Sequence, residues 1–316
     1  MFERILIVGQ GQDGSILKEL CKINNKDYYT ISKEQIYKNE IKISNIKFSD
    51  ETIVDFICDN SIDTVFYTSA LQIGNSIKDI AEESKFYDIN SKIPFNILKK
   101  ISKSNYKNLL NFYYFSSCYL FQPNKGISLG SKKILNDFYK KSKNDFLVKA
   151  KNFELSDNIC LKNIYLFPHD SPLKEKSFLN NLIFSIKEEK KVDIALSDKR
   201  LELFIDCAFE LMKSIFKDAQ NNKFRQGVHE HFLGGLNSFN LHDFLKFLVK
   251  KYHNESNIDL FVNFTDIEID YYHCIESNMY ETNLYYEKIS PSDFWERMTL
   301  EKESYINAIQ NNFFKT

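Results

Sequence analysis

The feature that most constrains this chain is the segment ILIVGQGQDGSIL at residues 5–17, where a short apolar run meets three glycines and a helical pattern begins. Gly9, Gly11 and Gly14 have the spacing G-x-G-x-x-G. Such glycines allow a tight turn, close approach of a pyrophosphate and close packing of helix on strand, while the helix start offers free N–H donors. The segment therefore predicts a dinucleotide site that also includes Gln12 and Asp13. An ordinary strand-to-helix turn is the alternative.

Strand patterns alternate with helical patterns along the first half of the chain, which is typical of an α/β fold with a doubly wound parallel sheet. Helices are expected at about 50–59, at 80–102 with an interruption near Pro94, and at 131–142. We expect a Rossmann dinucleotide-binding domain at 1–160. A small C-terminal α/β substrate-binding portion at 161–316 is expected to be interleaved with the Rossmann core. Strands are expected at 4–8, 28–31, 43–48, 64–68, 109–116 and 160–166.

Charge and composition exclude several classes of protein. A formal net charge of −1 gives no global field for nucleic acid or an anionic membrane. No apolar run approaches the length that crosses a bilayer, and no signal pattern precedes the first strand. We therefore expect neither nucleic acid nor a membrane as a partner. The cysteines lack C-x-x-C spacing, so we expect reduced thiols in a cytoplasmic protein. They are Cys21, Cys58, Cys118, Cys160, Cys207 and Cys274.

The end of the second expected strand bears on the choice of dinucleotide. An acidic side chain at this place accepts a hydrogen bond from the ribose 2′-hydroxyl of NAD. Here the strand ends at Ser32 and Lys33, and the first acid is Glu34. A hydroxyl and an ammonium suit the 2′-phosphate of NADP, which a carboxylate would repel. We expect NADP, with NAD as the alternative if Lys33 is a solvated loop residue.

Five segments of the chain carry a family resemblance: Gly11–Ser15, Ser69–Ala70, Ser116–Ser117, FPHDSP at residues 167–172, and Lys199–Arg200. Together they resemble the extended short-chain dehydrogenase/reductases that act on nucleotide sugars, and within them the GDP-mannose 4,6-dehydratases. The resemblance covers nearly the whole chain and implies that Ser69 and Ala70 also line the dinucleotide site. One departure is the single residue between the first two loop glycines, where the family usually has two.

The resemblance implies a catalytic set of Ser/Thr, Tyr and Lys, the last two in the pattern Y-x-x-x-K. Ser117 falls on the Ser/Thr position and Lys132 on the lysine, which also holds the nicotinamide ribose. Ser128 then occupies the tyrosine position. If the pattern is read one residue later, Leu129 takes the tyrosine position and Lys133 takes the lysine position. Neither reading supplies a tyrosine.

Tyr119 stands where the dehydratases carry a glutamate that abstracts a sugar proton. Without that carboxylate, the elimination of water lacks an evident base. Tyr119 is therefore either a relocated acid/base, with a pKa depressed by Lys132 and the nicotinamide, or an aromatic side chain that serves packing.

The substrate is expected to bind mainly to the C-terminal part. The resemblance places Asn163, Lys174 and Lys176 around the nucleotide and Arg200 near the diphosphate, where its fork can hold two oxygens; a surface arginine is the alternative for Arg200. We expect no metal site, because the histidine pair at residues 229–231 lacks a third spaced ligand.

Three hypotheses follow. The first is an NADP-dependent reductase, epimerase or dehydratase acting on a nucleotide-activated sugar, GDP-linked by resemblance, in bacterial-type surface polysaccharide synthesis. The second is a catalytically impaired homologue that binds dinucleotide or nucleotide sugar as a regulatory or partner subunit. The third is an unrelated Rossmann protein, such as an NAD-binding sensor. The resemblance also implies a homodimer or tetramer that pairs through the helices at 80–102 and 131–142.

Overall fold

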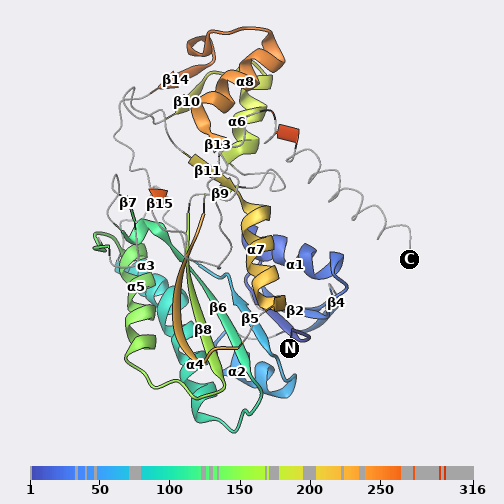
Figure 1. The fold of residues 1–316 in the computed structure, drawn as a ribbon, viewed down its shortest axis with the longest axis vertical. Coiled ribbons are helices and arrows are strands. Elements are labelled where there is room, and N and C mark those ends of the chain that lie inside the picture. The colour runs from blue at the N-terminus through green and yellow to red at the C-terminus, as the bar shows by residue number, and fades with distance from the viewer. Residues whose placement is uncertain are drawn as a thin grey trace.

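An eight-stranded sheet with helices on both faces forms the centre of the computed structural model (Figure 1). Six strands run parallel in the order β12-β8-β6-β5-β1-β2, and β3 and β4 extend the β2 edge as antiparallel strands. The predicted doubly wound, mostly parallel sheet is therefore confirmed.

The structure describes residues 2–32, 35–39, 41–45, 48–70, 80–121, 126–127, 131–133, 135–167, 169–170, 178–194, 204–221, 224–234, 239–264, 273–274, 292 and 295–296.

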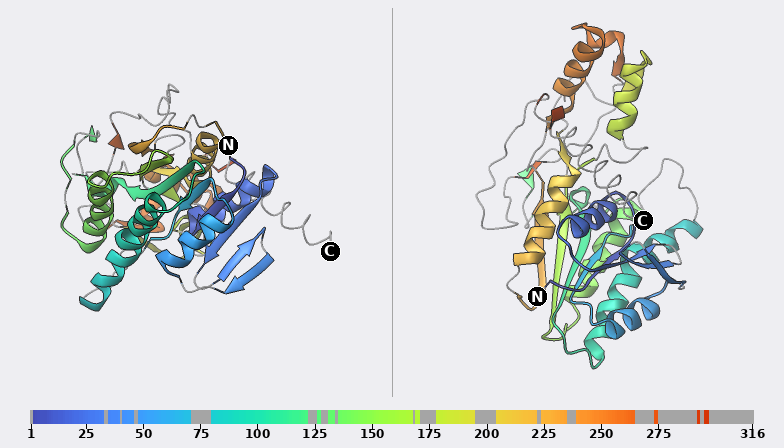
Figure 2. Two further views of the ribbon diagram at one scale, coloured as in Figure 1. Left: turned by 90° about the horizontal axis from the view of Figure 1, so that it is seen from below. Right: turned by 90° about the vertical axis from the view of Figure 1, so that its right-hand side faces the viewer.

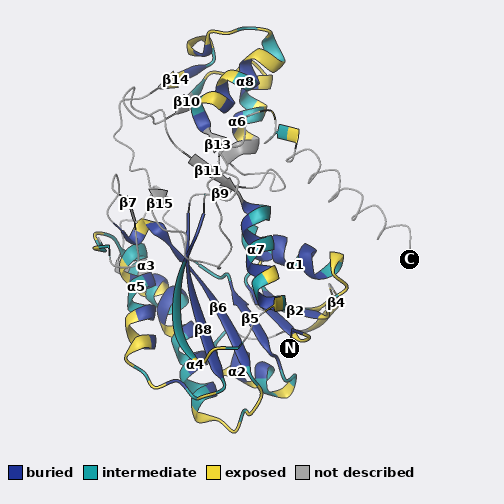
Figure 3. Cartoon of the chain, viewed as in Figure 1, coloured by how far each residue is buried: buried dark blue, intermediate teal, exposed yellow. Residues whose placement is uncertain are grey.

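The strands of the main sheet are short in the N-terminal half and longer toward the β12 edge. Their residues are buried in the centre of the sheet, as Figure 3 shows, because helices cover both faces. The bounds are β1 Ile5–Val8, β2 Tyr28–Ser32, β3 Gln35–Lys38, β4 Ile41–Asn45, β5 Thr64–Tyr67, β6 Leu110–Ser117, β8 Ile159–Leu166 and β12 Gly227–Leu233.

The β2 edge differs from the expectation of a single short strand at 43–48. β3 pairs antiparallel with β2, and Ser32 pairs with Gln35, so that only two residues join the strands. The pattern of β3 is weak because only Ile36 of its four residues is buried. The chain thus adds two antiparallel strands at the place where one short strand was expected.

Helices cover both faces of the sheet (Figure 2). A layer of buried apolar side chains lies between the sheet and the helices on each face. Helices α1 (Gln12–Ile23) and α7 (Ala208–Asn221) pack on one face, with Leu17 and Ile215 fully buried. Helices α2 (Asp50–Asp59), α4 (Ile93–Lys103) and α5 (Phe138–Lys151) pack on the other. The glycine loop after β1 and the start of α5 are thereby fixed at the carboxyl ends of the parallel strands, where ligands of such sheets bind.

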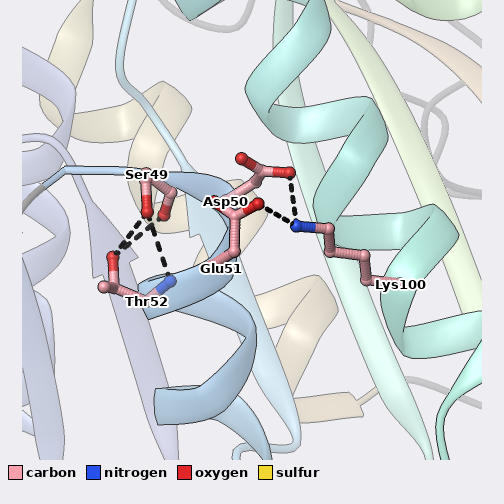
Figure 4. Close-up of polar contacts among 5 residues, drawn as sticks. All are labelled: Ser49, Asp50, Glu51, Thr52 and Lys100. Atoms are coloured by element: carbon pink, nitrogen blue, oxygen red, sulfur yellow. Dashed lines mark hydrogen bonds and ion pairs between the residues drawn. The ribbon is translucent and has the colours of Figure 1, made fainter.

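The start of α2 shows how polar side chains fix a helix end in this fold (Figure 4). The Ser49 hydroxyl accepts a hydrogen bond from the Thr52 backbone N–H at 3.4 Å. Lys100 of α4 donates a hydrogen bond to Glu51, and its Nζ lies 3.0 Å from Asp50 Oδ2, so it joins the two helices. The hydrogen bond from Lys100 lowers the pKa of Glu51 to about 2. Acids in the first turn also complement the helix dipole.

The expected long helix at 80–102 is three elements in sequence: α3 (Ile80–Tyr87), a π-helical turn η1 (Asp88–Lys92), and α4. The buried Tyr67 hydroxyl donates to the Ile89 carbonyl at 2.8 Å, and the Tyr114 hydroxyl donates to the Asn90 carbonyl. Two tyrosines of neighbouring strands therefore bind carbonyls of the irregular turn.

A smaller portion lies beyond the carboxyl ends of the sheet strands (Figure 1). Its core joins α6 and α8, and β10 pairs in parallel with β14. No helix in the described part of the chain is long and apolar enough to span a membrane. The bounds are β9 His169–Asp170, α6 Phe178–Lys187, β10 Val192–Ile194, β11 Phe204–Cys207, β13 Phe239–Asn240, α8 Leu241–His253 and β14 Val262–Phe264; β7 Gly126–Ile127 pairs with β15 His273–Cys274.

Candidate active site

Two glycines of the loop after β1 are required by packing. Gly9 has φ +106°, and a Cβ on it would lie 2.7 Å from the Ser69 nitrogen. A Cβ on Gly14 would lie 2.1 Å from the Gly9 carbonyl oxygen. The Thr68 hydroxyl contacts the carbonyl oxygens of Val8 and Gly9 at 3.1 Å each. The turn and the approach of α1 to β1 therefore both depend on the absence of side chains.

Gly11 differs, because a Cβ on it would meet nothing within 4 Å. It is the N-cap residue of α1, and no side chain caps the helix there. The first N–H groups of the helix, including those of Gln12 and Asp13, have no partner within the helix itself, and the glycine beside them is exposed. This arrangement fits a bound pyrophosphate, since N–H donors and the dipole favour an anion at this end.

Residues at the ends of β2 and β5 also lie near the glycine loop. Ser69 and Ala70 follow β5 and are half-buried, with Ser69 directly against Gly9. Ser32, the last residue of β2, is also half-buried, while Lys33 lies outside the described residues. Gln10 donates from Nε2 to the Thr30 hydroxyl at 2.8 Å and so ties the loop to β2. Apart from Lys132, the predicted cofactor residues that are described therefore lie at or just after the carboxyl ends of β1, β2 and β5.

At the end of β6, Ser117 lies close to the first turn of α5. Its hydroxyl accepts from the Tyr119 backbone N–H at 3.2 Å and also hydrogen-bonds with the Tyr139 side chain. Burial raises the pKa of Tyr139 to about 12, although the hydrogen bond with Ser117 acts in the opposite direction. A serine hydroxyl and a phenol are thus paired at the carboxyl edge of the sheet.

Lys143 lies one helical turn after Tyr139 and is buried, with 1% of its surface exposed. Its Nζ donates to the Phe115 carbonyl at 2.6 Å and lies 4.6 Å from the centre of the Tyr114 ring. Burial lowers the pKa of Lys143 to about 7, against a smaller opposite effect of Asp13 on the loop. Ser117, Tyr139 and Lys143 therefore form one cluster, and Lys143 is within the electrostatic influence of the glycine loop.

The expected helix at 131–142 is wrong in position, because α5 begins at Phe138. Lys132 is exposed and lies before the helix, in a segment where Lys133 forms an isolated bridge with Phe121. Ser128 lies outside the described residues. A catalytic role of Ser128 and Lys132 stays a prediction, and the described residues 131–133 are not helical. The pattern Y-x-x-x-K does occur, as Tyr139-Lys140-Lys141-Ser142-Lys143, and this signal was missed.

Tyr119 follows Ser117 in the 3₁₀ turn η2 (Cys118–Leu120) and is 41% exposed. The expectation that Lys132 and a bound nicotinamide depress its pKa stays a prediction. Desolvation by the surrounding protein raises the pKa of Tyr119, with further increases from Cys118 and Tyr139. Its phenol is therefore held in the neutral form, which can donate a hydrogen bond but is a poor base.

The predicted substrate residues are not brought together in the described part of the chain. Asn163 is fully buried within β8, paired in register with Tyr114 and Glu230, so the structure gives it no surface for a substrate, and its role stays a prediction. Lys174, Lys176 and Arg200 lie outside the described residues. Among the described residues, no group of three or more His, Cys, Asp or Glu side chains could hold a metal ion.

Comparison with known proteins gives a consistent result. The model of the NAD dependent epimerase/dehydratase family matches residues 5–203. A UDP-N-acetylglucosamine 4-epimerase structure from Bacillus cereus matches with a TM-score of 0.69 at 13% identity, covering 94% of this chain and 98% of the other. A search of curated proteins found no match.

Two further solved structures are similar to this chain. The UDP-glucuronic acid 4-epimerase of Bacillus cereus, in complex with UDP-glucuronic acid and NAD, has a TM-score of 0.68 and 15% identity, covering 92% of this chain and 96% of the other. The dTDP-4-dehydrorhamnose reductase of Bacillus anthracis, in complex with NADP, has a TM-score of 0.67 and 17% identity, covering 95% and 99%. At these identities the likeness shows a common fold.

Gly11 and Gly14, at the start of α1, are expected to respond differently to substitution by alanine. Gly11→Ala should leave the melting temperature unchanged, because its Cβ meets nothing, but should weaken dinucleotide binding by about tenfold or more by obstructing the anion. Gly14→Ala should destabilise the fold itself through the contact with the Gly9 carbonyl. Thermal unfolding and fluorescence titration with NADPH and NADH check both; a Gly11→Ala protein that binds normally contradicts the assignment.

Proposed function

Since the chain belongs to the NAD-dependent epimerase/dehydratase family, we propose that it is an enzyme that uses a nicotinamide dinucleotide to modify a nucleotide-activated sugar. The observation that carries this proposal is the cluster of Ser117, Tyr139 and Lys143 beside the glycine loop. A phenol paired with a serine hydroxyl, and a buried amine one turn later, supply the groups that move a proton to or from a sugar hydroxyl.

Each residue of the cluster has a distinct role in this proposal. Tyr139 exchanges the proton with a sugar hydroxyl or carbonyl oxygen, and Ser117 binds the same oxygen and orients it. Lys143 binds the nicotinamide ribose, and its positive charge, when protonated, favours the phenolate form of Tyr139. The bound dinucleotide supplies or accepts the hydride. The pKa of about 12 for Tyr139 keeps it protonated at neutral pH, so it is disposed to act as the acid.

The finer points of the proposal have separate support. Solved neighbours are described in complex with NAD or with NADP, and we favour NADP because Ser32 ends β2 without an acid. The GDP-linked sugar, the likeness to GDP-mannose 4,6-dehydratase, and the place in surface polysaccharide synthesis rest on the sequence resemblance. A homodimer or tetramer that pairs through α4 and α5 is proposed on the same ground.

The second candidate function is that of a catalytically impaired homologue that binds dinucleotide or nucleotide sugar. It was motivated by the apparent loss of the catalytic tyrosine at position 128. Tyr139 hydrogen-bonds with Ser117 and precedes Lys143 by one turn, so this motive no longer stands and catalysis is favoured. The glutamate that Tyr119 replaces is still absent, which favours epimerisation or reduction over elimination of water.

The catalytic assignment predicts a clear contrast between two tyrosines. Tyr139→Phe should lower kcat on an accepted nucleotide sugar by about 10²- to 10⁴-fold with little change in dinucleotide affinity, because it removes the acid/base group alone. Tyr119→Phe is the matched control and should change kcat far less. Steady-state kinetics with a panel of UDP-, dTDP- and GDP-sugars measures both. If Tyr119→Phe is the slower enzyme, the proton moves through Tyr119 instead.

The choice of dinucleotide is tested separately by fluorescence titration with NADPH and NADH. We expect tighter binding of NADPH, because no described carboxylate ends β2 to repel the 2′-phosphate. Tenfold tighter binding of NADH, about 1.4 kcal/mol, would show that the NADP assignment is wrong.

A further inference from the structure

Asp13 places a carboxylate in the first turn of α1, inside the loop proposed to hold a pyrophosphate. An acid at this position stabilises a free helix N-terminus through the dipole. It also repels an anion bound at the same N–H groups, and a few ångströms between like charges in a partly buried site makes that repulsion substantial. The side chain is 21% exposed, so solvent screens it only in part. The loop therefore needs a group that offsets the charge of Asp13.

His169 of β9 supplies the contact, although it lies 156 residues further along the chain. Its Nε2 is 3.0 Å from Asp13 Oδ1, and its Nδ1 is 2.7 Å from the Phe167 carbonyl oxygen. The imidazole is 15% exposed. It thus joins the glycine loop of the N-terminal half to the segment that leads from β8 into the smaller portion.

The chemistry of these two contacts defines the protonation of the pair. A carbonyl oxygen only accepts hydrogen bonds, so Nδ1 carries a hydrogen that it donates to Phe167. An ionised carboxylate also only accepts, so the contact between Nε2 and Asp13 requires a second proton, on the ring or on the carboxyl group. With that proton the pair is neutral wherever the proton resides. Without it the pair carries one negative charge beside the anion site.

Two further titratable groups interact with Asp13. From α5, Lys143 and Tyr139 interact electrostatically with Asp13. Strand register places Asp206 of β11 beside His169, and Asp170 follows His169 directly. Burial lowers the pKa of Lys143 to about 7, so Lys143 also loses charge as the pH rises and its effect has to be measured separately.

We propose that His169 is a positioning residue of the dinucleotide site, which shares a proton with Asp13 and so neutralises the carboxylate beside the pyrophosphate loop. The proposal rests on the function proposed above. Its consequence is that affinity for an anionic dinucleotide falls as the pH rises and the shared proton is lost. A second consequence is that the smaller portion, through β9, contributes to a site formed otherwise by the N-terminal half.

Calorimetric titration with NADPH at about pH 6 and about pH 9 tests the inference. The wild type should bind NADPH at least about tenfold more tightly at the lower pH than at the higher pH. His169→Gln should bind weakly at both, because Asp13 then stays charged. The double variant His169→Gln/Asp13→Asn should recover the affinity and retain only the pH dependence that Lys143 contributes. Thermal unfolding without dinucleotide reports whether each variant is folded.

A measurement on the wild type keeps the test independent of the variants. Nitrogen NMR of His169 should show both ring nitrogens bearing or sharing hydrogens at about pH 6, and NADPH should move its titration to higher pH. Equal affinity of wild type and His169→Gln at the lower pH, or a titration unmoved by NADPH, overturns the inference and leaves the proposed function intact. A wild type that binds neither NADPH nor NADH at either pH overturns both.

Discussion

The buried amino group of Lys143 is the constraint on which the site depends. A cation taken out of water is costly unless polar groups surround it, and no described carboxylate forms an ion pair with this one. Its near contacts are the Phe115 carbonyl and the face of the Tyr114 ring, both on β6. Any shift of α5 along the sheet would break these contacts. The same placement brings Tyr139, one turn earlier, to Ser117 at the end of that strand.

The packing beneath α5 reinforces this placement. The Tyr114 ring stacks on Phe146 of α5 with centroids 3.9 Å apart, and its hydroxyl donates to Asn90 in the π-helical turn. The Asn90 side chain donates to Ser142, which donates in turn to the Tyr139 carbonyl at 2.9 Å. The irregular turn therefore has a structural function: it directs the Asn90 side chain toward the helix that carries the proposed acid, and the Asn90 carbonyl toward Tyr114 of β6. A regular helix at 88–92 would place these groups differently.

The features that the sequence predicted well are those encoded locally. The glycine loop, the helix at 50–59 and the aromatic strand of β6 each depend on a short pattern of side chains, and all three are present. The position of α5 was predicted wrongly, because the helix was expected to start at residue 131, whereas Asp137 caps it by accepting from the Lys140 N–H. The sequence Tyr139 to Lys143 was the signal that could have corrected it. The contact of Asp13 with His169 had no local signal, because it depends on how β9 returns to the loop.

The most direct test of this account is a crystal structure of the chain with bound NADPH. The account predicts the pyrophosphate at the N-terminus of α1, with the Lys143 amino group and the Tyr139 hydroxyl within hydrogen-bond distance of the nicotinamide ribose, at about 3 Å. A structure in which Lys132 contacts the ribose, or in which Tyr139 is directed away from the nicotinamide, would contradict it.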